Sequence, residues 1–579
     1  MWRRHSMINM QKISILLLGL LLSASLPAQR NGDVTFQQDR DSVVDQHITL
    51  ERDFKPVIQD AGKIYSAPKV YEPHETNEMR VDYTEYSKLL QSDYNVNQLT
   101  FAESRFMRTV DNYNGFLKAA AGYPLTALDF YYKMKEIDKV AFDIHFNHLG
   151  QWASTKHNGA GILARSGGGF NVDVLFGSNS AFNIGFDAVN LTSKRYYKGA
   201  YWDFDAHIGV HSLPAAPITY KVQFGYRGFS AKNTPIDSLL VLPEAAFPVL
   251  DNQILTIAQV DYALDAHHIG LNANIKDHFY SSKDTLFQGS NFNTMHFEPY
   301  YSYQSNKVDV HAGVNLDISL NKGRLFAASP NITFETRLVQ EWLAIYGGAT
   351  GNYGVHGLYE DVTNNHYVNI LQAVHDTVNS YNVADAFLGL KVRPHYDLLI
   401  KFYAHFLYTI DDHYYIADAM THQFSSIYAN SNEWKIGASV HYHYRDIATL
   451  SVDGFYRLHN YNSDILPAAL DRPSWQILID VRAKLDKDKK WTLFSENYLI
   501  GGRNALVANI DPADPTLTDV VKLKPIIDLN IGVEYAIDRN FAAFVKLSDY
   551  IHWGKFKNYQ WYDYSTQGGN IVAGVSWTF

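Results

Sequence analysis

Apolar and polar residues alternate one by one through most of the chain after residue 112. In Val308–Ile318, apolar residues occupy every second position, with Asp, His, Gly, Asn and Asp between them. Side chains of a β-strand point alternately to its two faces, so this pattern predicts strands with one apolar and one polar face. The same alternation recurs in Val140–Asn147, Ile218–Arg227, Trp434–Arg445 and Ile527–Tyr535.

The connections between these strands alternate in length. Short polar turns occur at 136–138, 178–180, 214–217, 264–265, 304–306, 340, 394–395, 445–446, 486–489 and 538–539, and longer polar loops such as 151–166, 231–251, 355–381, 411–433, 504–522 and 551–567 separate them. Transmembrane barrels have short periplasmic turns and long extracellular loops. The turns, with an opening and a closing strand, predict an all-β, antiparallel transmembrane barrel of about 22 strands (range about 14–22).

Composition supports this fold class over a water-soluble alternative. Aromatic residues make up 14% of the chain, including 40 Tyr and 10 Trp, which suits a barrel with two interfacial girdles. A water-soluble β-sandwich would also show alternating apolar and polar residues. It would not need the alternation of short turns with long loops together with an export signal, which residues 1–28 provide. The net charge of −10 argues against a nucleic-acid partner, and the absence of cysteine excludes thiolate metal sites.

The first 111 residues differ from the rest. Residues 1–28 combine basic residues, the apolar run Ile13–Leu22 and small residues up to Ala28, which predicts a secretory signal peptide. Residues 29–111 carry no sustained alternation, so we expect a short periplasmic or lumenal arm. Residues 112–579 are then the outer-membrane barrel.

The final segment, Gly568–Phe579, places Ile571, Ala573, Val575, Trp577 and Phe579 on one face of an extended strand. A closing strand with an apolar face and a terminal aromatic is similar to the signal that the outer-membrane insertion machinery reads. We therefore predict that Trp577 and Phe579 act as an insertion signal.

These features resemble the TonB-dependent receptors, whose barrels end in a strand similar to Asn570–Phe579. The aromatic, glycine-ended loop before that strand is similar to theirs at Tyr559, Trp561, Tyr562, Tyr564, Gly568 and Gly569. The chain more specifically resembles a group of receptor-like barrels of Bacteroidota, through Leu50–Ile64 and Asp187–Gly199. The arm is too short for the complete plug of such receptors. The resemblance implies a short TonB-coupling segment, for which Ile48, Thr49 and Leu50 are the candidates.

No catalytic, cofactor or metal site is predicted. His441 and His443 lie two apart on one strand face, and His207 and His211 lie four apart, but neither pair has a third ligand in sequence and lumen-lining polarity explains them. No Ser stands in a G-x-S-x-G setting, so we predict that the protein is not an enzyme. The glycine run Arg165–Gly169 is interpreted as a flexible loop. Inward acids and bases together suggest pairing across the lumen or a filled interior.

Two functions remain. The first is an outer-membrane transporter or receptor that moves or binds a small solute. The second is a non-transporting barrel subunit of a larger outer-membrane assembly, with its pore closed by its own arm or by a partner. The expected partners are outer-membrane lipid, the barrel insertion machinery, TonB or a surface lipoprotein, and an unknown small solute. We expect the aromatics Trp561 and Tyr562 to be the loop residues that suit ligand stacking.

Overall fold

The computed structural model describes residues 114–579, apart from 138, 154–160, 178, 214–217, 237–246, 340–341, 376–377, 446, 462–465, 467–469, 510–516, 553–558 and 566–567. The predicted signal peptide, the arm and the candidate coupling residues Ile48, Thr49 and Leu50 lie outside the described residues. The first described strand begins at Gly115.

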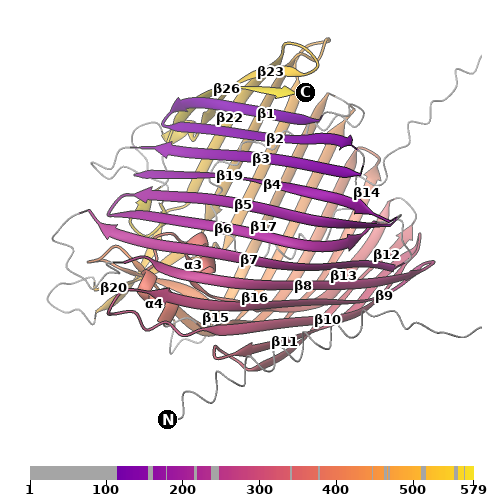
Figure 1. The fold of residues 1–579 in the computed structure, drawn as a ribbon. Coiled ribbons are helices and arrows are strands. Elements are labelled where there is room, and N and C mark those ends of the chain that lie inside the picture. The colour runs from indigo at the N-terminus through magenta and orange to yellow at the C-terminus, as the bar shows by residue number, and fades with distance from the viewer. Residues whose placement is uncertain are drawn as a thin grey trace, which may run out of the picture. The chain divides into compact units, whose positions relative to one another are not determined.

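The described chain is almost entirely β-strand (Figure 1). The strands are β1 Gly115–Tyr123, β2 Leu125–Ile137, β3 Val140–Trp152, β4 Ile162–Phe176, β5 Ser180–Lys194, β6 Tyr197–Ser212, β7 Ile218–Pro235, β8 Val249–Leu264, β9 His267–Ser282, β10 Phe292–Gln304, β11 Val308–Leu320, β12 Phe326–Val339, β13 Leu343–Gly354, β14 Ser380–His395, β15 Leu398–Asp418, β16 Phe424–Tyr444, β17 Ala448–Tyr461, β18 Trp475–Lys484, β19 Trp491–Gly501, β20 Arg503–Ala508, β21 Thr518–Leu523, β22 Ile526–Ala536, β23 Phe541–Ser548, β24 Tyr559–Trp561, β25 Tyr564–Ser565 and β26 Asn570–Thr578. The helices are α3 Leu358–Asn364, α4 Ile370–His375 and the 3-10 turn η1 Tyr550–His552.

Twenty-two of these strands form a closed antiparallel barrel, as the sequence predicts. Each strand from β1 to β18 pairs with the next; β19 then pairs with β22, β22 with β23, and β23 with β26. Strand β26 then pairs with β1, from Thr578 opposite Phe116 to Ile571 opposite Tyr123, and this pairing closes the ring. The ring therefore has no free strand edge, which satisfies the hydrogen-bond requirement of a membrane-spanning sheet.

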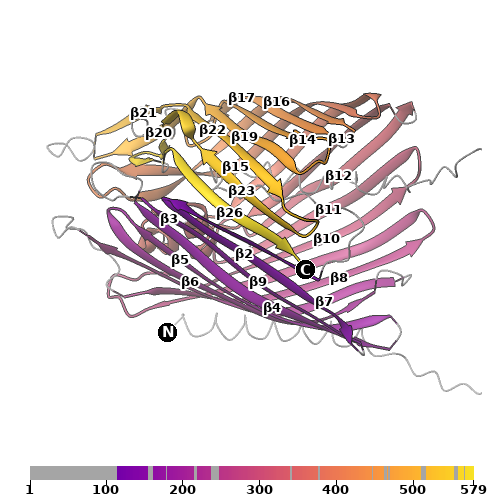
Figure 2. The same cartoon turned by 90° about the horizontal axis from the view of Figure 1, so that it is seen from above.

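The ten predicted short turns fall at or beside the connections at one end of this barrel, the end where Phe579 lies. By the rule for such barrels, that end is periplasmic. Two tight turns at the other end, between β1 and β2 and between β5 and β6, were not predicted from the sequence. The view from above in Figure 2 shows the strands running obliquely around the ring.

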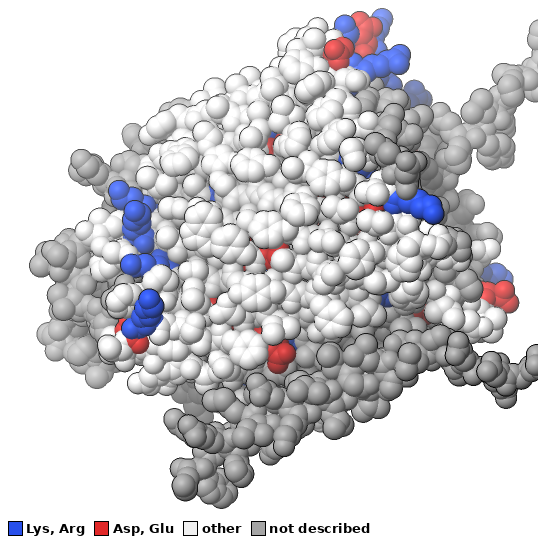
Figure 3. All heavy atoms as spheres, in the orientation of Figure 1, with Lys and Arg blue, Asp and Glu red and all other residues white. Residues whose placement is uncertain are grey.

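The outer face of the barrel is apolar. Ile144, Phe146, Phe224, Ile436 and Trp434 are each between 39% and 58% exposed and belong to the predicted apolar faces. Figure 3 shows charged side chains at the two ends of the strands and very few on the broad band between them. An apolar band between polar ends is the lipid-facing surface of a transmembrane barrel, so the protein is an integral outer-membrane barrel.

The inner face carries the polar residues of the alternation, and its charges are largely paired. The pairs join neighbouring strands along the wall: Arg227 Nη2 lies 2.8 Å from Asp205, Arg337 3.1 Å from Asp309, and Arg482 3.4 Å from Glu496. Pairing of inward charges was predicted, but these three pairs lie within the wall and not across the lumen. Among the described residues, neither helix is long and apolar enough to span a membrane.

Candidate functional site

The longest hairpin of the barrel bends over its extracellular mouth. Strands β15 and β16 each contain 21 residues, whereas about 9–11 residues suffice to cross a membrane. The pairing register shifts between Thr409 and Asp412, and Asp411 has a φ of 52°, which marks a bulge that bends the strand. Beyond it, Ile416–Asp418 pair in parallel with Leu506–Ala508 of β20. The prediction of a long loop at 411–433 is therefore wrong, because only residues 419–423 connect the two strands.

The tip of this hairpin contacts strands far around the ring. The Tyr197 hydroxyl, in β6, donates a 2.6 Å hydrogen bond to the Thr421 carbonyl. The ring of Tyr196, beside β6, stacks on His422 with 3.8 Å between centroids. Strand β6 lies nine strands from β15 in the 22-strand ring, so these contacts cross the mouth of the lumen.

Four segments fold together over the mouth, and we call them the cap: the β15–β16 tip (412–429), the loop 355–379 that carries α3 and α4, the β20–β21 hairpin, and the β24–β25 hairpin. Figure 1 shows α3 and α4 at the end of the strands away from the labelled C-terminus. The cap and the wall share a buried apolar core: Tyr201, Phe229, Ala231, Val249, Tyr280, Phe292, Leu358, Val362, Val368, Ile370, Ala373, Val374, Tyr415, Ala417, Phe424, Ala505, Val507, Trp561 and Tyr564. The core thus reaches across that mouth, from strands β6–β10 on one side to β15 and β16 on the other.

The loop aromatics belong to this core. Trp561 is 3% exposed and meets the rings of Tyr415 and Phe424 edge-on, at 5.3 and 5.6 Å between centroids. Tyr564 stacks on Tyr367 at 3.6 Å. The expectation that Trp561 suits ligand stacking is therefore wrong in this conformation, because its ring is buried inside the cap against Tyr415 and Phe424. Tyr562 is partly exposed and only borders the core.

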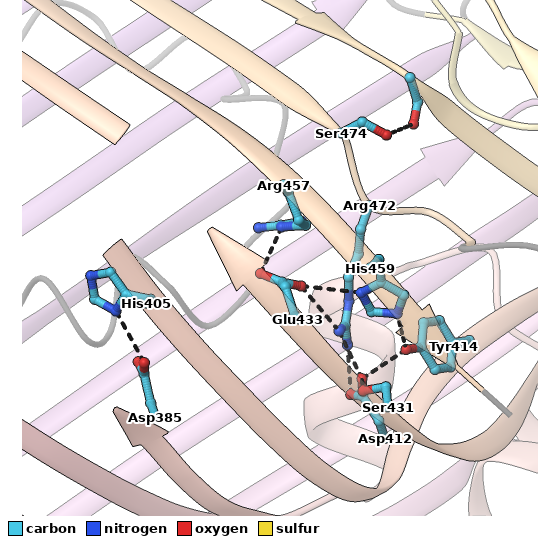
Figure 4. A network of polar contacts seen from close by, with 11 residues as sticks. Asp385, His405, Asp412, Tyr414, Ser431, Glu433, Arg457, His459, Arg472 and Ser474 are labelled. Carbon is cyan, nitrogen blue, oxygen red and sulfur yellow. Dashed lines mark hydrogen bonds and ion pairs between the residues drawn. The ribbon is translucent and has the colours of Figure 1, made fainter. Parts of the chain in front are cut away.

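A buried ionic network holds the bend of the hairpin (Figure 4). Arg472, in the loop before β18, donates two hydrogen bonds to the Asp412 carboxylate, at 2.7 and 2.6 Å. The Tyr414 hydroxyl donates to the same carboxylate at 2.8 Å. Glu433 pairs with Arg457 at 2.7 Å and with His459 at 3.2 Å. A two-pronged arginine–carboxylate contact fixes orientation as well as distance, so the network sets the angle of the tip.

A second buried polar group lies under α3. Asp251 and His278, on β8 and β9, are fully buried and 3.2 Å apart, and Lys276 lies 3.0 Å from Glu360 of α3. Burial favours the neutral form of Glu360, but the charge of Lys276, reinforced by His278, outweighs burial and lowers the pKa of Glu360 to about 2. Glu360 is therefore a carboxylate at neutral pH.

Several buried polar atoms in this layer have no hydrogen-bond partner among the described residues: Gln253 Oε1, His278 Nε2, Lys322 Nζ, Glu360 Oε2 and Asp361 Oδ2. Unpartnered buried polar atoms are costly, and native proteins usually satisfy them with water, an ion or a ligand. A β-carbon on Gly357 would lie 2.8 Å from Glu360 Oε2 and 2.8 Å from the Tyr280 hydroxyl, so the glycine keeps the backbone close to this layer. The arrangement can hold a polar species that has both donors and acceptors.

One group of three residues in the layer has metal-ligand character. His356 precedes α3, Asp361 lies in α3, and His413 lies in the bent part of β15. Their ligand atoms all lie within 4.8 Å of one another. A second such group consists of Asp251, His278 and Glu360. Sequence reasoning missed both groups, because their members come from different strands and loops and form no local spacing.

The predicted insertion residues lie at the seam of the ring. Trp577 faces Leu117 of β1 and Phe541 of β23, and it is 45% exposed. The Phe579 carbonyl accepts hydrogen bonds from the amides of Asn114 and Gly115, and its ring stacks on Tyr132 at 5.9 Å. The last strand thus closes the barrel. Its role as a signal for the insertion machinery stays a prediction.

The predicted histidine pairs lie in the wall. His441 bonds the hydroxyls of Ser439 and Ser451, and His207 bonds Asn183. The glycine run Arg165–Gly169 lies within β4, so its interpretation as a flexible loop is wrong. Gly169 faces Asp187 on β5, and a β-carbon there would lie 2.3 Å from Asp187 Oδ1. The glycine leaves room for the 2.8 Å contact between Asp187 and His145.

Comparison with known proteins gives likeness of fold only. No family model matches the chain, and no curated protein matches it in sequence. Solved structures do match: the siderophore receptor PirA from Acinetobacter baumannii has a TM-score of 0.61 at 10% identity, and the copper transporter OprC has 0.60 at 9%, each over 80% of both chains. The ferripyoverdine receptor of the outer membrane of Pseudomonas aeruginosa has 0.59 at 10%, over 81% of this chain and 72% of the receptor. The chain therefore has the barrel fold of the TonB-dependent outer-membrane receptors.

Proposed function

We propose that the protein is an outer-membrane receptor or transporter for a polar solute, with a mouth that the cap closes at rest. The observation that carries this proposal is the layer of unpartnered polar atoms beneath a cap made of loop segments. Solute sites combine an enclosing surface with a few convergent polar groups, and this layer offers both donors and acceptors. The structures of similar fold include siderophore receptors and a copper transporter, which agrees with solute binding.

The construction of the cap supports gating. A barrel of this strand number encloses a wide lumen that would leak if both ends were open. Of the four cap segments, three connect barrel strands and one is the bent tip of a hairpin beyond the membrane. They can rearrange without breaking the strand pairs of the ring, so opening need not dismantle the barrel. Lids of this kind commonly enclose a ligand and release it.

Single-channel conductance of the full chain tests the proposal. We expect wild-type protein to be silent and a variant with residues 357–375 replaced by a short Gly-Ser linker to show large, steady conductance. A linker in place of 486–489, the turn between β18 and β19 at the opposite end of the barrel, serves as the control and should leave the protein silent. A silent cap variant that still migrates as a folded barrel, or a wild type that conducts steadily, would contradict closure by the cap.

The assembly-subunit function has one observation in its favour: the cap and the wall share a continuous buried apolar core, as expected of a barrel that never opens. Isolation from native membranes separates the two functions. Recovery as a stoichiometric complex, for example with a surface lipoprotein, together with silent conductance of the cap variant would favour the assembly. Crosslinking of TonB to Ile48, Thr49 or Leu50 would favour energised uptake. The insertion machinery, through Trp577 and Phe579, is a partner under either function.

A further inference from the structure

We propose that His356, Asp361 and His413 bind one divalent transition-metal ion of the zinc type. His356 Nδ1 lies 3.5 Å from Asp361 Oδ1, and the ring centroids of His356 and His413 are 4.4 Å apart. Ligand atoms around a tetrahedral zinc ion, with bonds of about 2.0–2.1 Å, are about 3.3 Å from one another. In the structure the three ligand atoms lie within 4.8 Å of one another, so they surround a space of the size that such an ion needs.

The outer nitrogens of both imidazoles are already engaged. His356 Nε2 lies 2.9 Å from the Ser380 hydroxyl, and His413 Nε2 lies 2.9 Å from the Ser426 hydroxyl. Histidines that bind metals nearly always place their second ring nitrogen in a hydrogen bond, which fixes the ring and its tautomer. With each Nε2 held by a serine, each Nδ1 is the nitrogen available to an ion.

The carboxylate supplies an independent indication. Asp361 is 1% exposed, and its Oδ2 is one of the buried atoms without a partner among the described residues. Lys322 is near, but its Nζ lies over the ring of Phe292 at 4.5 Å and makes no hydrogen bond to Asp361. A buried carboxylate with one unpartnered oxygen, beside two oriented imidazoles, is a site that a cation would complete.

The donor set selects the kind of ion. Two imidazoles and one carboxylate suit Zn²⁺, Co²⁺, Ni²⁺ or Cu²⁺, whereas Ca²⁺ and Mg²⁺ prefer oxygen ligands alone. Three protein ligands leave the fourth position of a tetrahedral ion for water or for a donor atom of a solute. The neighbouring group of Asp251, His278 and Glu360 is less suited, because the Lys276 ammonium already pairs with the Glu360 carboxylate.

The site would also connect two parts of the cap. His356 and Asp361 belong to the loop between β13 and β14, and His413 belongs to the bent hairpin. An ion bound to all three would tie the loop to the hairpin beneath the mouth. Metal binding is therefore expected to stabilise the closed cap, whatever solute the protein carries.

Metal titration of the full chain tests the site. Detergent-solubilised protein is stripped with a chelator and titrated with Co²⁺, followed by visible absorption, and with Zn²⁺, followed by calorimetry. We expect one equivalent to bind, with the intense visible bands of four-coordinate Co²⁺. Asp361→Asn and His413→Gln should each weaken binding at least about tenfold. His405→Gln, which alters a histidine paired with Asp385 in the wall, is the matched control and should bind as wild type does.

Two results would overturn the proposal: less than one equivalent bound by wild type, or an Asp361→Asn variant with wild-type affinity. Heat-modifiable migration on gels checks that each variant is a folded barrel. Should Asp361→Asn not fold, His356→Gln carries the test, because His356 is 17% exposed and its loss disturbs packing least. Wild-type affinity in that variant would equally overturn the site.

Discussion

The Tyr197 hydroxyl donates a hydrogen bond to the carbonyl of Thr421, 224 residues away in the sequence, and the bond joins strand β6 to the tip of the β15–β16 hairpin. Both residues are at least 93% buried. This is a direct polar link between distant parts of the ring, and it lies in the cap and not in the barrel sheet. The contacts across the mouth and the strand pairs that close the barrel thus involve different groups, and they can be perturbed separately.

Tyr197→Phe should loosen the cap without weakening the barrel. The variant leaves a buried carbonyl without its donor, at a cost of about 1–2 kcal/mol, or roughly a tenfold rise in the population of the open cap. We expect brief conductance openings that wild type lacks, with an unchanged unfolding midpoint. Tyr226→Phe, on the lipid side of β7, removes a 2.6 Å hydrogen bond to Asn252 and should produce no openings.

Asp412→Asn should destabilise the hairpin tip strongly. The substitution leaves Arg472 buried without its bidentate partner, and removing one member of a buried pair costs about 3–5 kcal/mol. Faster cleavage of the tip by protease added to intact cells measures the effect. Asp309→Asn breaks a pair whose side chains are 38% exposed, and should change the free energy of unfolding by only about 0–1 kcal/mol. Equal effects of the two variants would contradict the role of burial.

The attachment of the β15–β16 tip to the loop before β18 should weaken as the pH rises from about 4 to 7, because of Asp471. Burial raises the pKa of this carboxyl to about 7, against the hydrogen bond from the Tyr415 amide and the charges of Arg503 and Arg472. The folded state therefore holds a proton that the unfolded state releases near its ordinary pKa of 3.8. The stabilisation is complete below pH 3.8 and is lost as the pH rises through about 7.

Asp471→Asn isolates that contribution. The amide cannot ionise, and Asn tolerates the positive φ of 56° at this position. We expect the free energy of unfolding of the variant to exceed that of wild type at pH 8 and nearly to equal it at pH 4. The difference at pH 8 should be on the order of 1–2 kcal/mol, because the side chain at position 471 is partly exposed and water screens its charge. Melting temperatures at both pH values check this. A pH-independent difference would show that hydrogen bonding, and not charge, is responsible.

The barrel could be predicted from the sequence because one physical rule acts on every spanning strand. Lipid outside and a polar lumen inside impose alternation residue by residue, as in Val308–Ile318. Tight turns at the periplasmic end interrupt that alternation with short polar stretches, so the number of strands could be predicted by counting these turns. The turns at Tyr123–Leu125 and Arg195–Tyr196 were missed because they join strands directly, without a polar loop.

The cap could not be predicted, because alternation ends where the membrane ends. Residues 412–429 have protein on both faces, so Tyr414, Tyr415 and Phe424 are all buried, and the segment looks like an aromatic loop. The candidate metal ligands were missed for a related reason. His356 and His413 are 57 positions apart in the sequence, and only the folding of the loop under the hairpin tip brings them together.

Phe579→Glu should impair insertion into the outer membrane if the terminal aromatic is a recognition signal. The Phe579 ring contacts Trp577, Tyr132 and Phe130 at the periplasmic end of the seam, where a charge on the lipid face costs only about 0–1 kcal/mol in stability. Loss of the heat-modifiable form from the outer-membrane fraction therefore indicates failed recognition. Phe130→Glu, which places the same charge beside the same ring cluster but away from the terminus, is the control and should insert, as should Phe579→Tyr. Normal assembly of Phe579→Glu, or equal failure of Phe130→Glu, would show that the terminal residue acts only through packing at the seam.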